Sequence, residues 1–229
     1  HARSMDQDDL RYHLDAFSPS PTRSRSVSLI QSIDELEALY GEVAETSRRK
    51  EVDRLVEPYQ RFITASPLVV LASCGDEGLD CSPKGDAPGF VRVFDEHTIA
   101  IPDRRGNNRL DNLRNLVRDP RVSLLFIIPG VSETLRVNGR AAISVDPELL
   151  ASFAVGGKPP KTVILVTVER VYFHCAKAMV RSALWRPEAW PDRASVPTCG
   201  EMLACITQGE LDGEQYDRDL PARIAARLY

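Results

Sequence analysis

Hydrophobic and polar positions along the chain change their spacing near Ser66. Between residues 32 and 66, apolar side chains recur every three or four positions, which is the period of a helix packed on one face. This spacing predicts amphipathic helices at residues 32–43 and within 50–66, and Pro58 is expected to break or kink the second one. After Ser66, short apolar runs bounded by turn residues take over, and these are typical of strands.

The strand-like runs fill the middle of the chain. The pattern predicts strands at residues 67–74, 89–95, 97–102, 121–129, 134–146 and 162–174, a returning strand or the end of one at 79–86, and helices at 146–155 and 220–229. About six strands therefore fall in a block of roughly 110 residues, and most are joined by hairpin-sized turns. We predict a mainly β (α+β) fold, an antiparallel barrel with flanking helices, rather than a doubly wound sheet.

One dipeptide tests this assignment. Asn138–Gly139 would normally signal a hairpin turn. However, apolar or small residues alternate with polar ones from Leu135 to Val145, straight through the pair. The alternation predicts a single long strand with Gly139 at a bulge or at a close approach of another backbone.

Domain boundaries follow from the same pattern. Residues 1–28 are expected to hold a cloning remnant and a polar arm rich in Ser, Arg and Pro. Residues 29–65 are expected to form a helical leader that packs on the barrel, and residues 66–229 the barrel domain with a C-terminal extension of helices and loops.

Composition and charge argue against some classes of protein. The 229 residues carry a formal net charge of -4, with 43% hydrophobic and 27% charged residues, which is typical of a globular domain. The acidic balance argues against a general nucleic-acid binder, and no apolar run approaches the roughly 20 residues of a membrane span. The five cysteines form no CxxC pair and the four histidines no HxH or HxxxH pair, so we expect reduced cysteines, a cytoplasmic location and no metal.

The turn within "IPDRRGNNRLDNLRNL", residues 101–116, is the most unusual stretch. A strand-like run leads into it and a helical pattern follows, so Asn107 or Asn108 is expected to cap the helix. The expected buried face of this helix consists of Leu110, Leu113, Leu116 and Val117.

Three arginines occupy the same turn. At a helix N-terminus, free backbone N–H groups and the helix dipole already favour an anion. Arg104, Arg105 and Arg109 would add charge-assisted bonds to a phosphate. The alternative is an ordinary polar turn with a good helix cap.

Two further segments carry polar or aromatic residues at strand ends. In "CSPKGDAPGFV", Ser82 and Lys84 offer donors, and the alternative is a Gly/Pro-rich hairpin with an ordinary lysine. In "FHCAKAMVRSALW", Arg181 and Trp185 would form a cationic and aromatic lid over a planar ligand. The alternative there is core packing by Trp185.

Together, the runs "SPKGDAPGFV", "IPDRRGNNRLDNLRNLVRDPRVSLLFIIPG", "ETLRVNGRAAIS" and "VYFHCAKAMVRSALW" resemble the pyridoxamine 5'-phosphate oxidase-like flavoproteins, in particular a bacterial subgroup of FMN-binding proteins. The resemblance covers about residues 60–190 in the same order. It implies a split β-barrel and a homodimer with two FMN sites at the subunit interface.

The resemblance also implies which residues hold FMN. The phosphate and ribityl end would be lined by Pro102, Asp103, Arg104, Arg105, Asn107, Asn108 and Arg109, the isoalloxazine edge and phosphate by Ser82, Pro83 and Lys84, and Arg181, Ser182 and Trp185 would come from the other subunit. Catalytic residues stay unassigned, because no side chain stands out as an acid or base.

One departure limits the expected function. The family's tryptophan-, glycine- and arginine-rich substrate motif is not found in residues 181–203, so oxidation of a vitamin B6 phosphate is not assigned. We expect an FMN-dependent oxidoreductase acting on an unidentified small molecule. The alternatives are a deazaflavin-dependent reductase of the same fold, a flavin-binding or sensing module without turnover, and, more weakly, a haem-handling protein with His174 as axial ligand.

Overall fold

The computed structural model describes residues 28–76, 78–106 and 108–229. The chain divides into two compact units, His1–Ala44 and Glu45–Tyr229. Within the described part of the first unit, helix α2 (Ile33–Tyr40) begins after Ser32, whose hydroxyl accepts the Glu35 N–H. The predicted boundaries at residues 28 and 65 stay predictions, and the predicted polar arm lies almost entirely outside the described residues.

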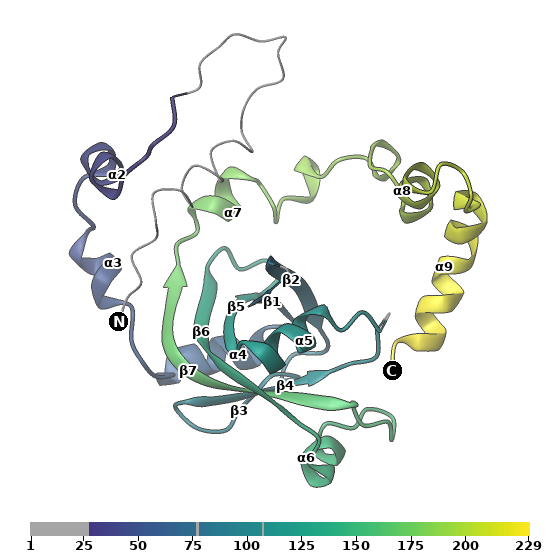
Figure 1. Cartoon of the computed structure of the whole chain (residues 1–229), viewed down its shortest axis with the longest axis horizontal. Helices are drawn as coiled ribbons and strands as arrows, with labels where there is room; N and C mark the ends of the chain where they lie inside the picture. The colour runs from purple at the N-terminus through teal and green to yellow at the C-terminus, as the bar shows by residue number, and fades with distance from the viewer. Residues whose placement is uncertain (1–27, 77, 107) are drawn as a thin grey trace. The chain divides into compact units, whose positions relative to one another are not determined.

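Seven strands of the second unit form one sheet (Figure 1). They are β1 (Leu68–Gly75), β2 (Gly78–Gly85), β3 (Arg92–Val93), β4 (Thr98–Asp103), β5 (Arg121–Ile127), β6 (Thr134–Ser144) and β7 (Thr162–His174). Their order is β2-β1-β5-β6-β7-β4-β3, and every neighbouring pair is antiparallel. The antiparallel fold with flanking helices is therefore confirmed.

Short helices flank the sheet. In the second unit they are α3 (Glu45–Arg49), α4 (Glu57–Ala65), α5 (Asp111–Arg118), α6 (Pro147–Ser152), α7 (Lys177–Arg181), α8 (Cys199–Ile206) and α9 (Gly213–Arg227), with 3-10 turns η1 (Pro187–Ala189) and η2 (Arg193–Ser195). Of the two outcomes expected for Pro58, a kink is not seen, but the stretch predicted within residues 50–66 is interrupted, because residues 51–56 are not helical and α4 begins only at Glu57. Pro58 lies in the first turn of α4, where its missing N–H has no helical partner to lose.

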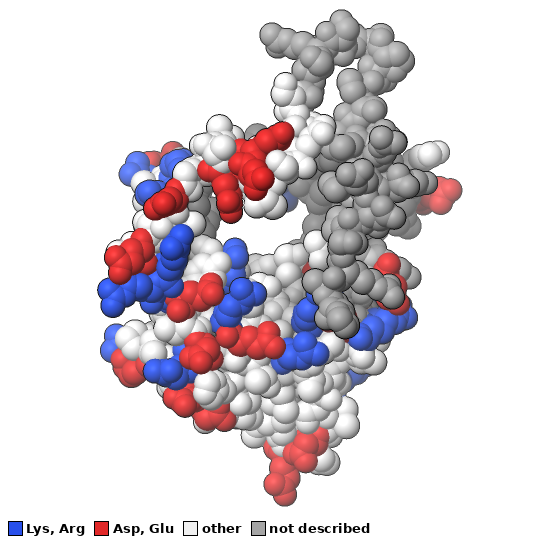
Figure 2. Space-filling model, turned by 60° about the vertical axis from the view of Figure 1, so that its left-hand side comes forward, with Lys and Arg blue, Asp and Glu red and all other residues white. Residues whose placement is uncertain are grey.

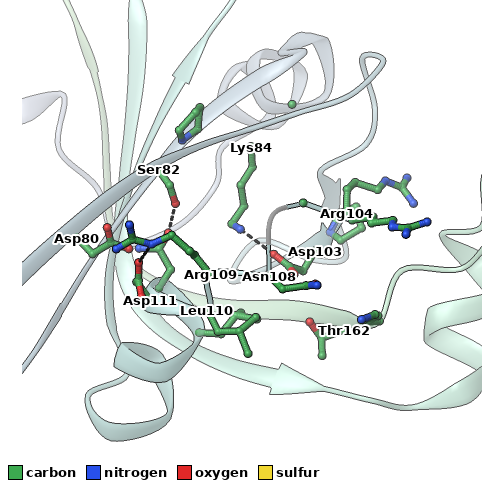
Figure 3. Close-up of a pocket in the computed structure, with 18 of the residues that line it drawn as sticks. Asp80, Ser82, Lys84, Asp103, Arg104, Asn108, Arg109, Leu110, Asp111 and Thr162 are labelled. Carbon is green, nitrogen blue, oxygen red and sulfur yellow. Dashed lines mark hydrogen bonds and ion pairs between the residues drawn. The ribbon is translucent and has the colours of Figure 1, made fainter. Parts of the chain in front are cut away.

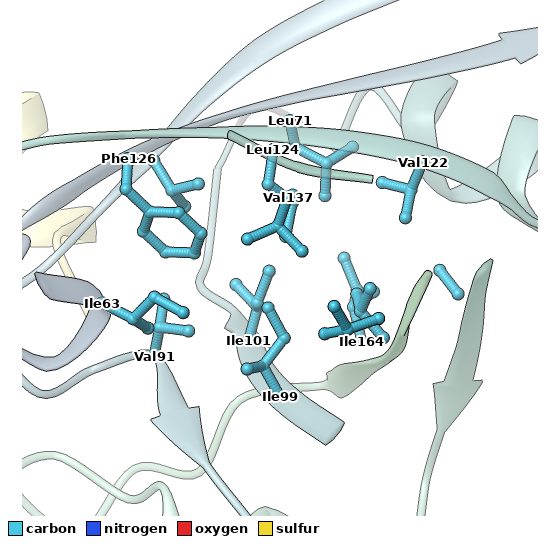
Figure 4. Close-up of a cluster of buried hydrophobic side chains, with 14 of the residues drawn as sticks. Ile63, Leu71, Val91, Ile99, Ile101, Val122, Leu124, Phe126, Val137 and Ile164 are labelled. Atoms are coloured by element: carbon cyan, nitrogen blue, oxygen red, sulfur yellow. The ribbon is translucent and has the colours of Figure 1, made fainter. Parts of the chain in front are cut away.

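The core lies between the two halves of the curled sheet (Figure 4). Leu71, Leu124 and Val137 come from β1, β5 and β6, and their side chains are fully buried. They face Ile101 and Ile164 of β4 and β7 across the interior. Strands from both halves of the sheet order, β1 and β5 on one side and β7 and β4 on the other, contribute to this core, and the Lys84–Asp103 ion pair shows that the end of β4 lies close to β2.

The β6–β7 pair contains the predicted irregularity. The register between these strands shifts at Asn138/Gly139, so the dipeptide lies inside one strand, as predicted. A Cβ atom on Gly139 would lie 2.0 Å from the carbonyl oxygen of Thr167. Gly139 is thus required by the close approach of the neighbouring backbone.

Of the helices that the structure describes, none is both long and apolar enough to cross a bilayer. On the face shown in Figure 2, Lys and Arg side chains lie among Asp and Glu side chains, and its described residues form no extended field of one sign.

Candidate functional site

A cavity of about 1020 Å³ opens beside β2, the end of β4, the loop into α5 and the start of β7 (Figure 3). It is lined by Asp80, Ser82, Pro83, Lys84, Gly85, Phe90, Pro102, Asp103, Arg104, Arg105, Gly106, Asn108, Arg109, Leu110, Asp111, Asn112, Leu113, Lys161 and Thr162. Nine of the predicted cofactor-binding residues are among them, from both predicted segments. Asn107 lies outside the described residues.

Strand β2 presents its polar side chains to the cavity because of its register. Ser82 pairs with Leu71 and Lys84 pairs with Val69, and both partners have side chains that point into the buried core. Residues two apart on a strand share a face, so Ser82 and Lys84 point to the inner side as well.

Lys84 forms an ion pair inside the cavity. Its Nζ lies 2.8 Å from Oδ1 of Asp103, and the two side chains are only 16% and 21% exposed. Figure 3 shows the lysine reaching across from β2 to the end of β4. The pair fixes the two strand ends relative to each other and leaves Lys84 as a partly neutralised cation.

Arg104 is held by contacts behind the cavity wall. Its Nε donates to Oδ2 of Asp86 at 2.7 Å, and Nη1 donates to the carbonyl oxygen of Phe153 at 2.7 Å. Burial acts to raise the pKa of Asp86, but hydrogen bonds from Tyr229, from a backbone N–H and from Arg104 outweigh it and hold that pKa below its usual value. Asp86 therefore remains a carboxylate that anchors Arg104.

The start of helix α5 differs from the prediction. Asn108 is not the N-cap: the helix begins at Asp111, and Leu110 occupies the cap position without a side-chain bond. Asn108 instead adopts a left-handed backbone conformation with φ of 60°, which Asn tolerates better than most residues. Of the arginines, Arg109 lies nearest to the helix start, and its Nε is 2.9 Å from Oδ2 of Asp111.

The buried face of α5 also differs. Leu116 is buried, but Leu110 and Val117 are exposed. The buried polar residue Asn112, 5% exposed, takes part of the expected apolar face. Its Nδ2 donates to the Ser73 hydroxyl at 2.9 Å, and its Oδ1 accepts from the Ser82 hydroxyl. This network ties α5 to β1 and β2 and orients Ser82 in the cavity.

Positive charge is in excess around the cavity. Its lining contains five Lys or Arg side chains and three Asp side chains. Arg105 and Lys161 are exposed, and no hydrogen bond or ion pair joins either to another described residue.

Oγ1 of Thr162 is buried and has no hydrogen-bond partner among the described residues. A buried hydroxyl without a partner costs free energy, and this one belongs to a residue of the cavity wall.

The predicted site and the observed cavity differ in two groups of residues. Lys161 and Thr162 were missed, because the pairing of β4 with β7 brings them to this wall. Asn112 was missed, because the buried face of α5 was expected to be apolar. Conversely, Arg181, Ser182 and Trp185 do not line the cavity of their own chain. Arg181 and Ser182 are exposed, and Trp185 Nε1 donates to the carbonyl oxygen of Val131 at 2.9 Å.

Metal chemistry has no visible site here. Among the described residues, no group of three or more His, Cys, Asp or Glu side chains could hold a metal ion. The five cysteines are all free thiols.

The fold is a small antiparallel barrel with a cavity at its strand ends, and positively charged side chains outnumber negatively charged ones in the lining of that cavity. The family model described as pyridoxamine 5'-phosphate oxidase matches residues 55–175, more than half of the chain, and the chain belongs to this family. A search of the curated proteins finds no match.

Solved structures with a similar fold come from several bacteria. The HupZ protein of Group A Streptococcus is 20% identical, with a TM-score of 0.42 over 51% of this chain and 90% of that one. A candidate pyridoxamine 5'-phosphate oxidase from Lactobacillus delbrueckii is 19% identical, with a TM-score of 0.41 over 53% and 99%. A FAD-binding protein from Mesorhizobium loti is 16% identical, with a TM-score of 0.37 over 52% and 94%.

Proposed function

We propose that the chain is an FMN-dependent oxidoreductase that acts on an unidentified small molecule as a cytoplasmic homodimer. The carrying observation is the cavity of about 1020 Å³, which combines an excess of positive charge with a buried, unpartnered hydroxyl. It lies inside the segment that places the chain in the pyridoxamine 5'-phosphate oxidase family.

The cavity fits a flavin mononucleotide in both of its chemical halves. An aromatic ring system requires flat apolar walls, and Phe90, Pro83 and Leu113 supply such surface. A phosphate ester requires donors and cations, and Arg105, Lys161 and Thr162 supply these without losing an existing partner in the described chain. The volume is at the upper end of the range of about 300–1,000 Å³ for small-molecule sites.

The residues then divide into three roles. Arg105 and Lys161 would bind the phosphate, and Arg104 would add a cation in a fixed position. Lys84, held by its ion pair with Asp103, would donate a hydrogen bond toward the polar edge of the ring.

When bound, FMN supplies the hydride and electron transfer that these side chains do not provide. The side chains hold it, exclude water from one of its faces and place positive charge near its anionic end. No protein acid or base is needed in these roles.

The residues Arg181, Ser182 and Trp185 belong to the proposed homodimer. They do not line the cavity of their own chain, so a role in FMN binding requires them to come from a second subunit. This assignment is part of the proposal.

The test is the visible absorption spectrum of the purified protein, followed by release of the ligand and determination of its mass. We expect an oxidised flavin spectrum and the mass of FMN at about one per subunit. A colourless protein that does not bind added FMN would refute the proposal. A deazaflavin or haem mass would keep the fold and transfer the function to that alternative.

A matched pair of variants locates the site. Arg105→Ala removes an exposed cation from the cavity wall, whereas Arg114→Ala removes an exposed arginine of α5 that does not line the cavity. We expect Arg105→Ala to raise the Kd for FMN by about ten- to hundredfold, the range of a charge-assisted hydrogen bond. Arg114→Ala should leave it unchanged, and equal effects of the two variants would place the phosphate elsewhere.

A further inference from the structure

Tyr229 lies outside the family-matched segment, which ends at residue 175, and contacts Asp86 and Arg104, of which Arg104 lines the cavity. Its hydroxyl donates to Oδ1 of Asp86 at 2.8 Å. Its ring lies 5.8 Å from the guanidinium carbon of Arg104. Lys158 Nζ donates to its main-chain carbonyl oxygen at 3.3 Å. Three contacts with the barrel thus converge on one residue.

Asp86 links Tyr229 to the cavity wall. One carboxylate oxygen accepts the Tyr229 hydroxyl and the other accepts Arg104 Nε. The Asp86 side chain is only 5% exposed, so water cannot easily replace either partner. The loss of the Tyr229 hydroxyl would leave a buried carboxylate oxygen with only a backbone N–H, that of Ala87 at 2.7 Å, as hydrogen-bond donor.

Arg104 transmits this arrangement to the ligand. Nε and Nη1 are bound to Asp86 and to the Phe153 carbonyl, and Nη2 donates to no other described residue. Arg104 itself lines the cavity. A guanidinium is planar, so fixing two of its nitrogens also fixes the direction in which the third donates.

We infer that Tyr229 is a positioning residue for the anionic end of the bound ligand, acting through Asp86 on Arg104. The inference rests on the proposed function, since it takes the ligand to be a flavin phosphate. It makes the C-terminal helical extension part of the selectivity of the site for a phosphorylated ligand. A tie that only fastens α9 to the barrel would stabilise the fold without this selectivity.

The experiment compares FMN with riboflavin, which has the same ring and no phosphate. Kd values for both are measured by flavin fluorescence quenching with the wild type and with Tyr229→Phe, which removes only the hydroxyl. We expect Tyr229→Phe to weaken FMN binding by about three- to tenfold, the range of one hydrogen bond, and to leave riboflavin binding within about twofold. A purely structural role would weaken both ligands alike.

The matched control is Tyr216→Phe in helix α9, which ends at Arg227, before Tyr229. The Tyr216 ring packs against Arg223, and its hydroxyl forms no hydrogen bond with a described residue, so the preference for FMN should stay unchanged. An unchanged preference in Tyr229→Phe would overturn the inference. If Tyr229→Phe does not fold, Asp86→Asn tests the link from Asp86 to Arg104 on which the inference depends, since it removes the charge that holds Arg104, and an unchanged preference for FMN would overturn the inference.

The binding of the two flavins by the wild type distinguishes a failure of the inference from a failure of the proposed function. A wild type that prefers FMN, together with variants that keep the preference, overturns the inference and leaves the proposed function intact. A wild type that binds neither flavin, or binds both equally, overturns the phosphate site and the role of Tyr229 with it.

Discussion

Thr162 has a buried hydroxyl on the cavity wall and no partner in the described chain. Thr162→Val keeps the shape of the side chain and removes the hydroxyl. Since an unpartnered buried hydroxyl costs about 1–3 kcal/mol, we expect the free energy of unfolding of the ligand-free protein to stay equal or to rise by about 1 kcal/mol. FMN binding should weaken by about three- to tenfold. Urea unfolding and flavin titration measure the two effects.

The control for this change is Thr167→Val, an exposed threonine on the same strand. It should alter neither quantity beyond about 0.5 kcal/mol. A Thr162→Val protein that loses stability without ligand would show that the hydroxyl has a structural partner, and the ligand argument would fail.

His174 gives the fold a dependence on pH. Burial lowers the pKa of His174, and the positive charges of Arg136 and Lys50 lower it further. Its ring also lies 5.0 Å from the Tyr172 ring, and Nε2 is buried without a partner in the described chain. The folded state therefore resists protonation, whereas the unfolded chain takes up a proton near pH 6.5.

The sign follows from this difference. As the pH falls below about 6.5, the unfolded state binds more protons than the folded state, so stability falls with it until the folded pKa is passed. We expect this loss between pH 7 and 5 in denaturant titrations of the wild type, and a smaller loss in His174→Gln. The control is His97→Gln, which changes an exposed histidine. A His174→Gln protein whose stability falls with decreasing pH as steeply as that of the wild type would contradict the role given to His174.

The site residues that could be predicted were those that stand together in the sequence. Arg104 and Arg105 share one turn, and Ser82 and Lys84 share one strand face, so spacing alone groups them. Thr162 could not be predicted, because its place depends on the register between β4 and β7, whose paired residues Asp103 and Thr162 are far apart in the sequence. The cofactor role of every one of these residues stays a prediction.

At the scale of the element, Gly139 is the residue on which the long β6–β7 pair depends. A Cβ atom there would meet the Thr167 carbonyl oxygen at 2.0 Å, and the opposing backbone would have to move. We expect Gly139→Ala to reduce the free energy of unfolding by about 1–3 kcal/mol, the usual cost of overpacking. Gly106→Ala is the control in equilibrium unfolding, since its added Cβ meets no atom within 4 Å. Equal stabilities of the two variants would contradict the role of the bulge.

Element types were easier to predict than element boundaries. The alternation through Asn138–Gly139 identified one strand correctly, because side chains on a half-buried strand must alternate. The start of α5 was misplaced, because Asn108 was taken for a cap and adopts a left-handed conformation instead. Both roles suit the same side chain, and only the path of the loop around the cavity decides between them.

At the scale of the molecule, the segment that matches the family model is followed by a C-terminal extension. Residues 55–175 carry the barrel core and every residue that lines the cavity, and α7, α8 and α9 follow. Tyr229 shows that this extension reaches the cavity wall of its own chain. Arg181 does not line that cavity, so a role for it in flavin binding requires a second copy of the chain.

This requirement gives a test in which two defective subunits restore each other. Arg105→Ala damages the cavity wall and Arg181→Ala the segment from the other subunit, and both side chains are exposed, so both variants should fold. If each site combines the two segments from different subunits, every mixed dimer has one intact site and one doubly defective site. Co-expression with random pairing should then restore about one quarter of the FMN sites, measured at a flavin concentration that leaves each variant alone unoccupied. If both segments came from one chain, mixing would restore no site, and the proposed interface would be wrong.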